Sequence, residues 1–175
     1  MKVISLKWRL LIVPVLILLN VSCDQVSKNV ARESLEYYER TEVFGDYVVL
    51  TKVENKGAML SAFADLPNKV RFIMLGIGPA IVLLLGIILL LSQRTAHPLR
   101  LLGFCFVIGG GMGNIIDRLL YGSVTDFLIL SAGPVRTGIF NMADVSVMLG
   151  TGLVVWSLIA QRIRERRMIT QEVEQ

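Results

Sequence analysis

The feature that most constrains this chain is a run of twenty consecutive residues without a charge, at positions 72–91. A helix needs about 20 predominantly apolar residues to cross the roughly 30 Å hydrocarbon core of a bilayer. A soluble domain would instead show apolar residues recurring with a period of 3.6 or 2. The run therefore predicts a membrane-spanning helix, and the rest of the chain is interpreted around it.

Three further apolar stretches follow the same logic, although each is slightly shorter than a full span. Flanking residues can complete such spans, because helices continue into the interface and their polar ends can face protein rather than lipid. The composition agrees, since 54% hydrophobic against 18% charged residues excludes a disordered protein. We predict one membrane-embedded domain over 1–175, with spans at about 8–26, 70–92, 99–117 and 141–161, outer loops at 27–69 and 118–140, and a basic cytoplasmic tail at 162–175.

The distribution of charge predicts the orientation of these spans. Cytoplasmic loops near span ends carry an excess of lysine and arginine. With both termini in the cytoplasm, the inner parts hold nine basic and three acidic residues, a net +6, while the outer parts hold nine basic and eleven acidic residues, a net −2. This topology explains the total net charge of +4, which therefore gives no reason to expect a nucleic-acid partner.

The N-terminus has two interpretations. Lys7 and Arg9, followed by an apolar run and then Val-Ser-Cys at 21–23, resemble a cleavable signal peptide, even that of a lipoprotein. A lipoprotein signal usually carries an aliphatic residue three positions before its cysteine, where this chain has Asn20. We therefore favour a first helix that is retained in the mature protein.

The two outer loops differ in character. Residues 24–38 are rich in helix formers, and residues 47–53 form a β-branched run after a Gly-Asp turn signal. The second loop, 117–141, contains three glycines and a proline, so irregular structure is expected there. The predicted fold class is an all-α integral membrane protein, with four transmembrane helices, cytoplasmic N- and C-termini, a small extracytoplasmic β-sheet and a short helix.

Ionisable and amide side chains at membrane depth are energetically costly, which makes them functional candidates. In this chain they gather at one face of the membrane, at the outer end of the third span, in the loop after it and at the start of the fourth span. Those of the third span are three or four positions apart, so they share a helix face. The group consists of Asn114, Asp117, Arg118, Asp126, Asn141 and Asp144.

Asp126 is the strongest catalytic candidate of this group. It lies just before an apolar run at 127–130, so its carboxyl is expected to be buried near the bilayer surface, with a raised pKa. If the loop folds back so that Asp126 faces Asp144, two carboxylates share one proton, as in aspartic proteases. One carboxylate can then act as a base on water while the other, protonated, polarises a carbonyl group.

Structural roles compete with catalysis at the neighbouring residues. Asn141 is a natural helix N-cap, and Asp144 falls in the first turn, where the helix dipole favours a carboxylate. Asp117 is expected to form an interfacial ion pair with Arg118. The glycine run at 109–113 is not followed by the Gly-Lys-Ser/Thr of a phosphate loop, so it indicates close helix packing.

Other site chemistries have little support in the sequence. Ser27 and Lys28 are adjacent and do not face each other on a helix, whereas Asp24 and Lys28, at i,i+4, are expected to form an ion pair. His97 lies in a cytoplasmic loop, away from the outer acids, so a Ser/His/Asp triad cannot assemble. Two cysteines and one histidine offer no cluster for a metal.

Five short motifs follow one another along the chain: Asp-Gln-Val-Ser-Lys at 24–28, Asn-Lys-Gly-Ala at 55–58, Gly-Asn-Ile-Ile-Asp-Arg at 113–118, Gly-Ser-Val-Thr-Asp-Phe at 122–127 and Phe-Asn-Met-Ala-Asp at 140–144. In this order, around four hydrophobic segments, they resemble the signature of the bacterial lipoprotein signal peptidases, also called signal peptidase II. The matches span nearly the whole chain and are highly specific together. One departure is that Met59-Leu60 stands where the family commonly has Ala-Phe.

The resemblance implies a membrane aspartyl endopeptidase that removes signal peptides from prolipoproteins, immediately before a diacylglyceryl-modified cysteine. It implies that Asp126 and Asp144 are catalytic, that no cofactor or metal is used, and that the partners are diacylglyceryl-prolipoproteins and membrane lipids. It places a protein, expected to be monomeric, in the bacterial cytoplasmic (inner) membrane, with the active site toward the extracytoplasmic face. The residues implied to bind substrate or support the dyad are Asp24, Lys28, Asn55, Gly57, Asn114, Asp117, Arg118 and Asn141.

Two other classes of membrane protein are alternatives. A non-enzymatic transporter or assembly factor could use the acids for proton or ion handling. A transporter would tend to place its acids near the bilayer midplane and show repeat symmetry, whereas here the acids lie at span ends and no repeat is present. A rhomboid-like serine protease would need a histidine within a span, and the single histidine of this chain lies outside the predicted spans.

Overall fold

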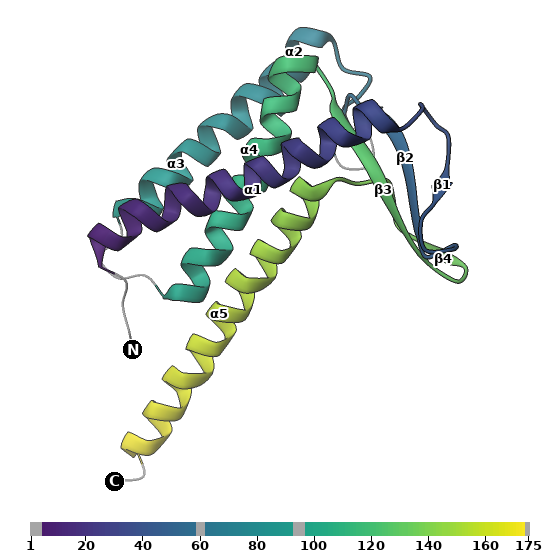
Figure 1. Cartoon of the computed structure of the whole chain (residues 1–175). Coiled ribbons are helices and arrows are strands. Elements are labelled where there is room, and N and C mark those ends of the chain that lie inside the picture. Colours follow the sequence, from purple (N-terminus) through teal and green to yellow (C-terminus); the bar gives the residue numbers. More distant parts are fainter. Residues whose placement is uncertain (1–4, 59–61, 93–96, 174–175) are drawn as a thin grey trace.

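Long apolar helices form most of the structure, a computed structural model that describes residues 5–58, 62–92 and 97–173 (Figure 1). Within these residues, four helical segments are long and apolar enough to cross a membrane. Each predicted span falls within one of them to within a residue, which confirms the four membrane helices of the predicted fold class. The segments are α1 (Leu6–Ser34), the continuous run of α2 (Asn68–Phe72), η2 (Ile73–Ile77) and α3 (Gly78–Ser92), α4 (Pro98–Tyr121) and α5 (Met142–Val173).

Two helices are longer than the sequence predicts. Residues 24–34 continue α1 without a break and do not form a separate short helix, because no glycine or proline interrupts the chain between 15 and 34. In the same way α5 continues through most of the basic tail, as far as Val173. Val13 and Ile17 of α1 are buried in the apolar core with residues of α4, which favours a first helix that is retained.

The second membrane helix contains a five-residue π segment, η2, directly before α3. Pro79 is the second residue of α3, and it lacks the N–H that an α-helix would use while its ring clashes with the carbonyl of residue i−4. A π turn widens the helix locally, so it lets the chain pass the proline within one helical path.

The centre of the bundle is α4, which packs against α1, α3 and α5. Its buried side chains, Leu101, Cys105 and Ile108, form the apolar core with residues of α1 and α3. Its glycines permit close approach, since a Cβ on Gly109 would overlap Asn20 of α1 and one on Gly110 would overlap the start of α5. The predicted packing role of the glycine run is thus confirmed at these positions.

A four-stranded antiparallel sheet projects from the end of the bundle at which α1 ends and α5 begins (Figure 1). Its strands lie side by side in chain order, and β2 pairs with β3 so that Val49 lies opposite Ile129 and Val53 opposite Asp126. An irregularity in β2 between Leu50 and Val53 adds one residue to that strand. The strands are β1 (Thr41–Glu42), β2 (Val48–Asn55), β3 (Val124–Ala132) and β4 (Val135–Arg136).

The strand predicted at 47–53 is confirmed as β2, but the prediction of irregular structure over 117–141 is wrong. Residues 124–132 form the longest strand of the sheet. The glycine and proline signals mark only the ends of this element, because Gly122 closes α4 at φ +72° and Gly133 opens the turn into β4 at φ +62°. The apolar run at 127–130 is therefore the middle of a strand paired with a distant segment.

Candidate active site

Asp126 and Asp144 come together at the junction of the sheet and the helices. Asp126 is the third residue of β3 and is 5% exposed, whereas Asp144 lies in the first turn of α5. Each Asp126 oxygen accepts one amide hydrogen bond, Oδ1 from Asn141 Nδ2 at 2.6 Å and Oδ2 from Asn55 Nδ2 at 3.0 Å. Asp144 Oδ1 accepts a bond from Asn114 Nδ2 at 3.0 Å.

Asn141 connects the two carboxylates. Its side-chain nitrogen donates to Asp126, while its backbone N–H donates to Asp144 Oδ2 at 3.2 Å. Its own Oδ1 accepts the backbone N–H of Asp144 at 3.1 Å, which is the capping interaction that the sequence predicts. Since Asn141 is fully buried, these bonds fix both the start of α5 and the position of the carboxylate pair.

Burial raises the pKa of Asp126 to about 6, in the direction that its apolar neighbours predict. The negative charge of Asp144 also raises this pKa, whereas the hydrogen bonds from Asn55 and Asn141 and the charge of Lys28 lower it. A carboxyl with this pKa exchanges its proton near neutral pH. The pair can therefore hold one proton and one negative charge in the same site.

A buried ionic cluster lies beside the pair, between α1 and α4. Lys28, which is fully buried, forms ion pairs with Asp24 at 2.8 Å and with Asp117 at 3.2 Å. Arg32 adds a third pair with Asp117, at 3.0 Å. The predicted pair of Asp24 and Lys28 is confirmed. The predicted pair of Asp117 and Arg118 is wrong, because adjacent helix residues point in different directions and Asp117 faces α1.

Lys28 also connects this cluster to the carboxylate pair. Its Nζ donates to Asn114 Oδ1 at 2.9 Å, and Asn141 Nδ2 donates to the same oxygen at 3.2 Å. With two donors on its oxygen, the Asn114 amide must direct its Nδ2 group toward Asp144. Lys28 thus orients a hydrogen-bond donor of the site through Asn114.

The chain directly after β2 is tied to the site by hydrogen bonds of Gly57. Gly57 N–H donates to Asn55 Oδ1 at 2.9 Å, so the loop turns back on the amide that contacts Asp126. Among the described residues Arg118 forms no ion pair, and it donates from Nη2 to the Gly57 carbonyl at 3.0 Å. The departure at Met59-Leu60 lies outside the described residues.

Several polar residues that hold this arrangement were not identified from the sequence. Glu54 accepts hydrogen bonds from Ser123 Oγ at 2.5 Å and Thr125 Oγ1 at 2.7 Å, and Thr125 Oγ1 also accepts from Arg32 Nε at 2.9 Å. Gln25 Nε2 donates to Asp117 Oδ1 at 3.0 Å. The sequence does contain one indication of Ser123 and Thr125: they are two positions apart, as side chains on one face of a strand are, directly before Asp126.

A hollow of about 350 Å³ lies beside Arg118, where the end of α4 meets the start of the second membrane helix. The carboxylates do not line this space, but Arg118 reaches both the hollow and Gly57 in the loop after β2. Among the described residues, no group of three histidines, cysteines or acids is arranged to hold a metal ion. The hollow is lined by Lys56, Asn68, Arg71, Phe72, Leu75, Gly76, Arg118, Tyr121 and Gly122.

Comparison with known proteins gives consistent matches. The model of a family described as signal peptidase (SPase) II matches residues 16–160. A protein named lipoprotein signal peptidase from an Azoarcus species is 36% identical over 134 residues, which are 77% of this chain and 74% of that protein. A protein of the same name from Moorella thermoacetica is 36% identical over 147 residues, 82% and 90% of the two chains.

A solved structure described as a bacterial membrane enzyme is similar in fold, with a TM-score of 0.74 at 25% sequence identity. The match covers 86% of this chain and 88% of that one. A second structure with the same description gives a TM-score of 0.72 over 83% of this chain. The arrangement of four membrane helices and a sheet is therefore shared with membrane enzymes of known structure.

Proposed function

Because the chain belongs to the signal peptidase II family, we propose that it removes signal peptides from prolipoproteins by cutting immediately before a diacylglyceryl-modified cysteine. The observation that carries this proposal is the junction of Asp126 and Asp144 through Asn141, which gives an aspartic protease its two carboxylates. Membership of a protease family also decides against the alternative of a non-enzymatic transporter or assembly factor.

In the proposed reaction the two carboxylates share one proton and hold the attacking water. The ionised carboxylate takes a proton from the water, whose oxygen bonds to the scissile carbonyl carbon, while the protonated carboxyl donates to the carbonyl oxygen. The resulting tetrahedral intermediate then breaks its C–N bond: the carboxyl that took the water's proton gives it to the leaving amine, and the other carboxylate takes back the proton of the hydroxyl that becomes the new carbonyl. Asn141, Asn55 and Asn114 keep the two carboxyl groups oriented throughout.

The substrate's acyl chains explain why such a site lies at the ends of membrane helices. A diacylglyceryl group anchored in the bilayer holds the peptide bond beside it at the interface. Each buried methylene contributes about 0.8 kcal/mol to this anchoring. We propose that the signal-peptide side of the bond approaches through the hollow beside Arg118, where Lys56 and Arg71 add positive charge. No cofactor or metal takes part in the proposed reaction.

The direct test is cleavage of one prolipoprotein, prepared with and without diacylglyceryl on its cysteine, by the purified full-length protein in detergent. We expect cleavage of the lipid-modified form. Asp126→Asn and Asp144→Asn should each reduce the rate by at least about a thousandfold, because a neutral amide cannot serve as either member of the dyad. Both variants should still accumulate in the membrane.

The matched control is Asp46→Asn, since Asp46 is an exposed acid of the loop before β2 and forms no ion pair among the described residues. It should retain the wild-type rate. Substantial turnover by purified Asp126→Asn or Asp144→Asn would contradict the dyad. Equal cleavage of the lipid-free substrate would leave the dyad in place but contradict the diacylglyceryl requirement.

A further inference from the structure

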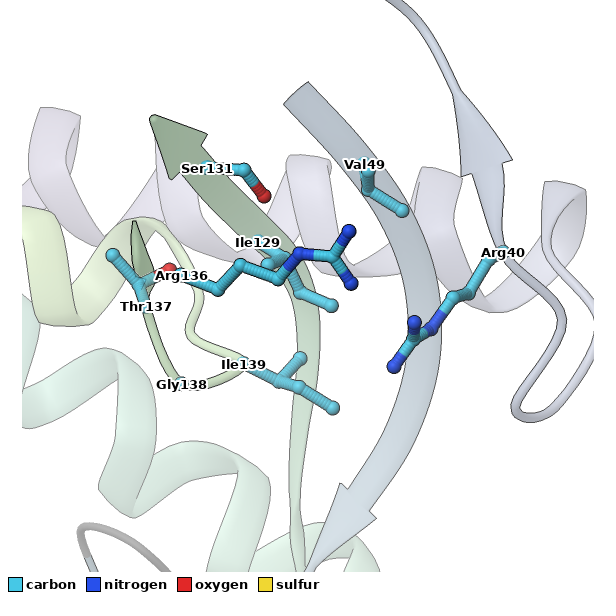
Figure 2. Close-up of a pocket in the computed structure, with 8 residues that line it drawn as sticks. All are labelled: Arg40, Val49, Ile129, Ser131, Arg136, Thr137, Gly138 and Ile139. Atoms are coloured by element: carbon cyan, nitrogen blue, oxygen red, sulfur yellow. The ribbon is translucent and has the colours of Figure 1, made fainter. Parts of the chain in front are cut away.

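A second hollow, of about 290 Å³, lies on the sheet and has no part in the proposed reaction (Figure 2). Its lining comes from the residue before β1, from β2 and β3, and from β4 and the segment that follows. Three aliphatic side chains, Val49, Ile129 and Ile139, line it together with the guanidinium groups of Arg40 and Arg136. The hollow thus combines apolar walls with two positive charges.

The strand pairing places this hollow on the face of β3 opposite the Asp126 side chain. Val49 pairs with Ile129, and Arg136 pairs with Ser131, so each pair points to one side of the sheet. Side chains alternate along a strand, and Ile129 and Ser131 are an odd number of residues from Asp126. The hollow is therefore separate from the candidate active site.

The two arginines extend over the hollow from opposite sides (Figure 2). Across the described part of the chain, neither guanidinium lies within 4.0 Å of a carboxylate. Glu39 and Glu42 are the acids nearest to Arg40 in sequence, and neither pairs with it. Two guanidinium groups that converge without an acid between them are suited to bind an anion with several oxygens, such as a phosphate.

A buried hydroxyl adds an independent indication of a ligand. Ser131 is only 9% exposed, and its Oγ has no hydrogen-bond partner in the described structure. Figure 2 shows this oxygen directed toward the space between Arg136 and Val49. A buried polar group without a partner is unfavourable, so an anion that accepts its hydrogen bond would be stabilised there. Thr137 Oγ1 accepts from Leu130 N–H, which leaves the Thr137 hydroxyl hydrogen free to donate.

The surroundings of the hollow indicate where this anion comes from. Large apolar and aromatic side chains are exposed on the strands and turns beside it, among them Tyr38, Phe44, Tyr47 and Val135. Aromatic side chains gather at the level of the lipid headgroups in membrane proteins. The sheet projects from the end of the membrane helices, which is where headgroups lie (Figure 1).

We propose that the hollow binds the phosphate of an anionic phospholipid headgroup, of the phosphatidylglycerol type. Arg40 and Arg136 neutralise the phosphate, the hydroxyls of Ser131 and Thr137 donate to its oxygens, and the aliphatic wall contacts the glycerol carbons. Binding would hold the sheet against the membrane surface. The proposal does not depend on the peptidase activity, because no residue of the dyad or of its hydrogen-bond network lines the hollow.

The test measures binding of dioctanoyl-phosphatidylglycerol to the full chain in neutral detergent by native mass spectrometry. Arg40→Gln/Arg136→Gln should weaken binding by at least about tenfold, because both charge-assisted contacts are lost. The matched control is Arg162→Gln/Arg164→Gln, which removes the same charge from exposed residues at the far end of α5 and should change the affinity by less than about twofold. Ser131→Ala should weaken binding about threefold.

Further measurements decide the outcome. The thermal midpoint without lipid and the cleavage of a prolipoprotein in neutral detergent should both stay at wild-type values in the arginine variant. Equal weakening in the two arginine variants, or equally tight binding of phosphatidylcholine, would overturn the proposal. Displacement of the lipid by inorganic phosphate at similar concentrations would show that the ligand is free phosphate. If Arg40→Gln/Arg136→Gln left lipid binding unchanged but slowed the cleavage of acidic substrates, the hollow would bind the peptide substrate and the lipid proposal would be overturned.

Discussion

Asn141 has a structural role and, in the proposed mechanism, a chemical one, and a pair of substitutions can separate them. Its Oδ1 caps α5, while its Nδ2 donates to Asp126. Asn141→Ala should lose about 1 kcal/mol of stability with the cap. It should also lose roughly a hundredfold in cleavage rate, as is typical when one donor of a preorganised site is removed.

The informative comparison is Asn141→Asp. Aspartate is as good an N-cap as asparagine, so the cap is kept, and any loss of stability comes from placing a third carboxylate beside Asp126. It cannot donate to Asp126, and it adds a third carboxylate to the site. Cleavage should therefore remain at least as low as in Asn141→Ala. Recovery of activity together with stability would show that Asn141 acts only as a cap.

The raised pKa of Asp126 predicts how cleavage depends on pH. In the proposed mechanism the pair is active with one proton, so kcat/KM should fall as the pH rises through the pKa of Asp126, about 6, where that proton is lost. It should fall again at acidic pH, when the second carboxylate is protonated. The measurement is kcat/KM in detergent between roughly pH 4 and pH 9. A profile in which kcat/KM falls at neither acidic nor alkaline pH would contradict a shared proton.

Local spacing explains which contacts of the site the sequence could predict. Asp24 and Lys28 are one helical turn apart, so their ion pair follows from the helix alone. The partners of Asp117 do not follow in this way, because Lys28 and Arg32 belong to another helix and reach Asp117 only after α1 packs against α4. The sequence allowed the proposal that Asp126 faces Asp144, because two carboxylates could share a proton. It did not show that Asn141 would connect them by hydrogen bonds.

At the scale of elements, close packing between α4 and α5 depends on a pair of facing glycines. A Cβ on Gly150 would lie 2.5 Å from the carbonyl oxygen of Gly103 and 2.7 Å from the backbone nitrogen of Val107. Gly150→Ala should therefore separate the helices and reduce the free energy of unfolding by about 1–3 kcal/mol. The measurement is thermal or denaturant unfolding in a fixed detergent.

Gly152 provides the control on the same helix. A Cβ there meets nothing within 4 Å, so Gly152→Ala should be neutral or more stable by up to about 1 kcal/mol, because alanine is the better helix former. The two variants make the same chemical change two residues apart. If both destabilised the protein equally, helix propensity or detergent contacts would explain the result better than packing.

Hydropathy predicted the four spans because each is encoded in one continuous segment. The strand β2 could also be predicted from its β-branched run. The strand β3 could not, since its apolar middle and flanking glycines are equally compatible with a loop lying on the membrane. Its structure depends on pairing with β2, which precedes it by two membrane helices.

At the scale of the whole molecule, the charge distribution predicts that the sheet lies outside the cytoplasm. Val135, in β4 at the tip of the sheet, and Met168, near the end of α5, are both well exposed. A membrane-impermeant maleimide should label Val135→Cys in intact cells and Met168→Cys only after permeabilisation. The background variant is Cys23→Ser, because Cys23 is exposed while Cys105 is buried. Labelling with the opposite preference would reverse the topology.

The order of the site residues along the chain bears on the protein's biosynthesis. Lys28 is on the first helix, Asn114 on the third span and Asp126 on the strand after it, while Asn141 and Asp144 belong to the last helix. No carboxylate pair exists until that last helix has left the ribosome and inserted beside α4. If this pair is the catalytic dyad, as we propose, the enzyme is latent through its own translation, and partly inserted chains are not expected to cut neighbouring peptides.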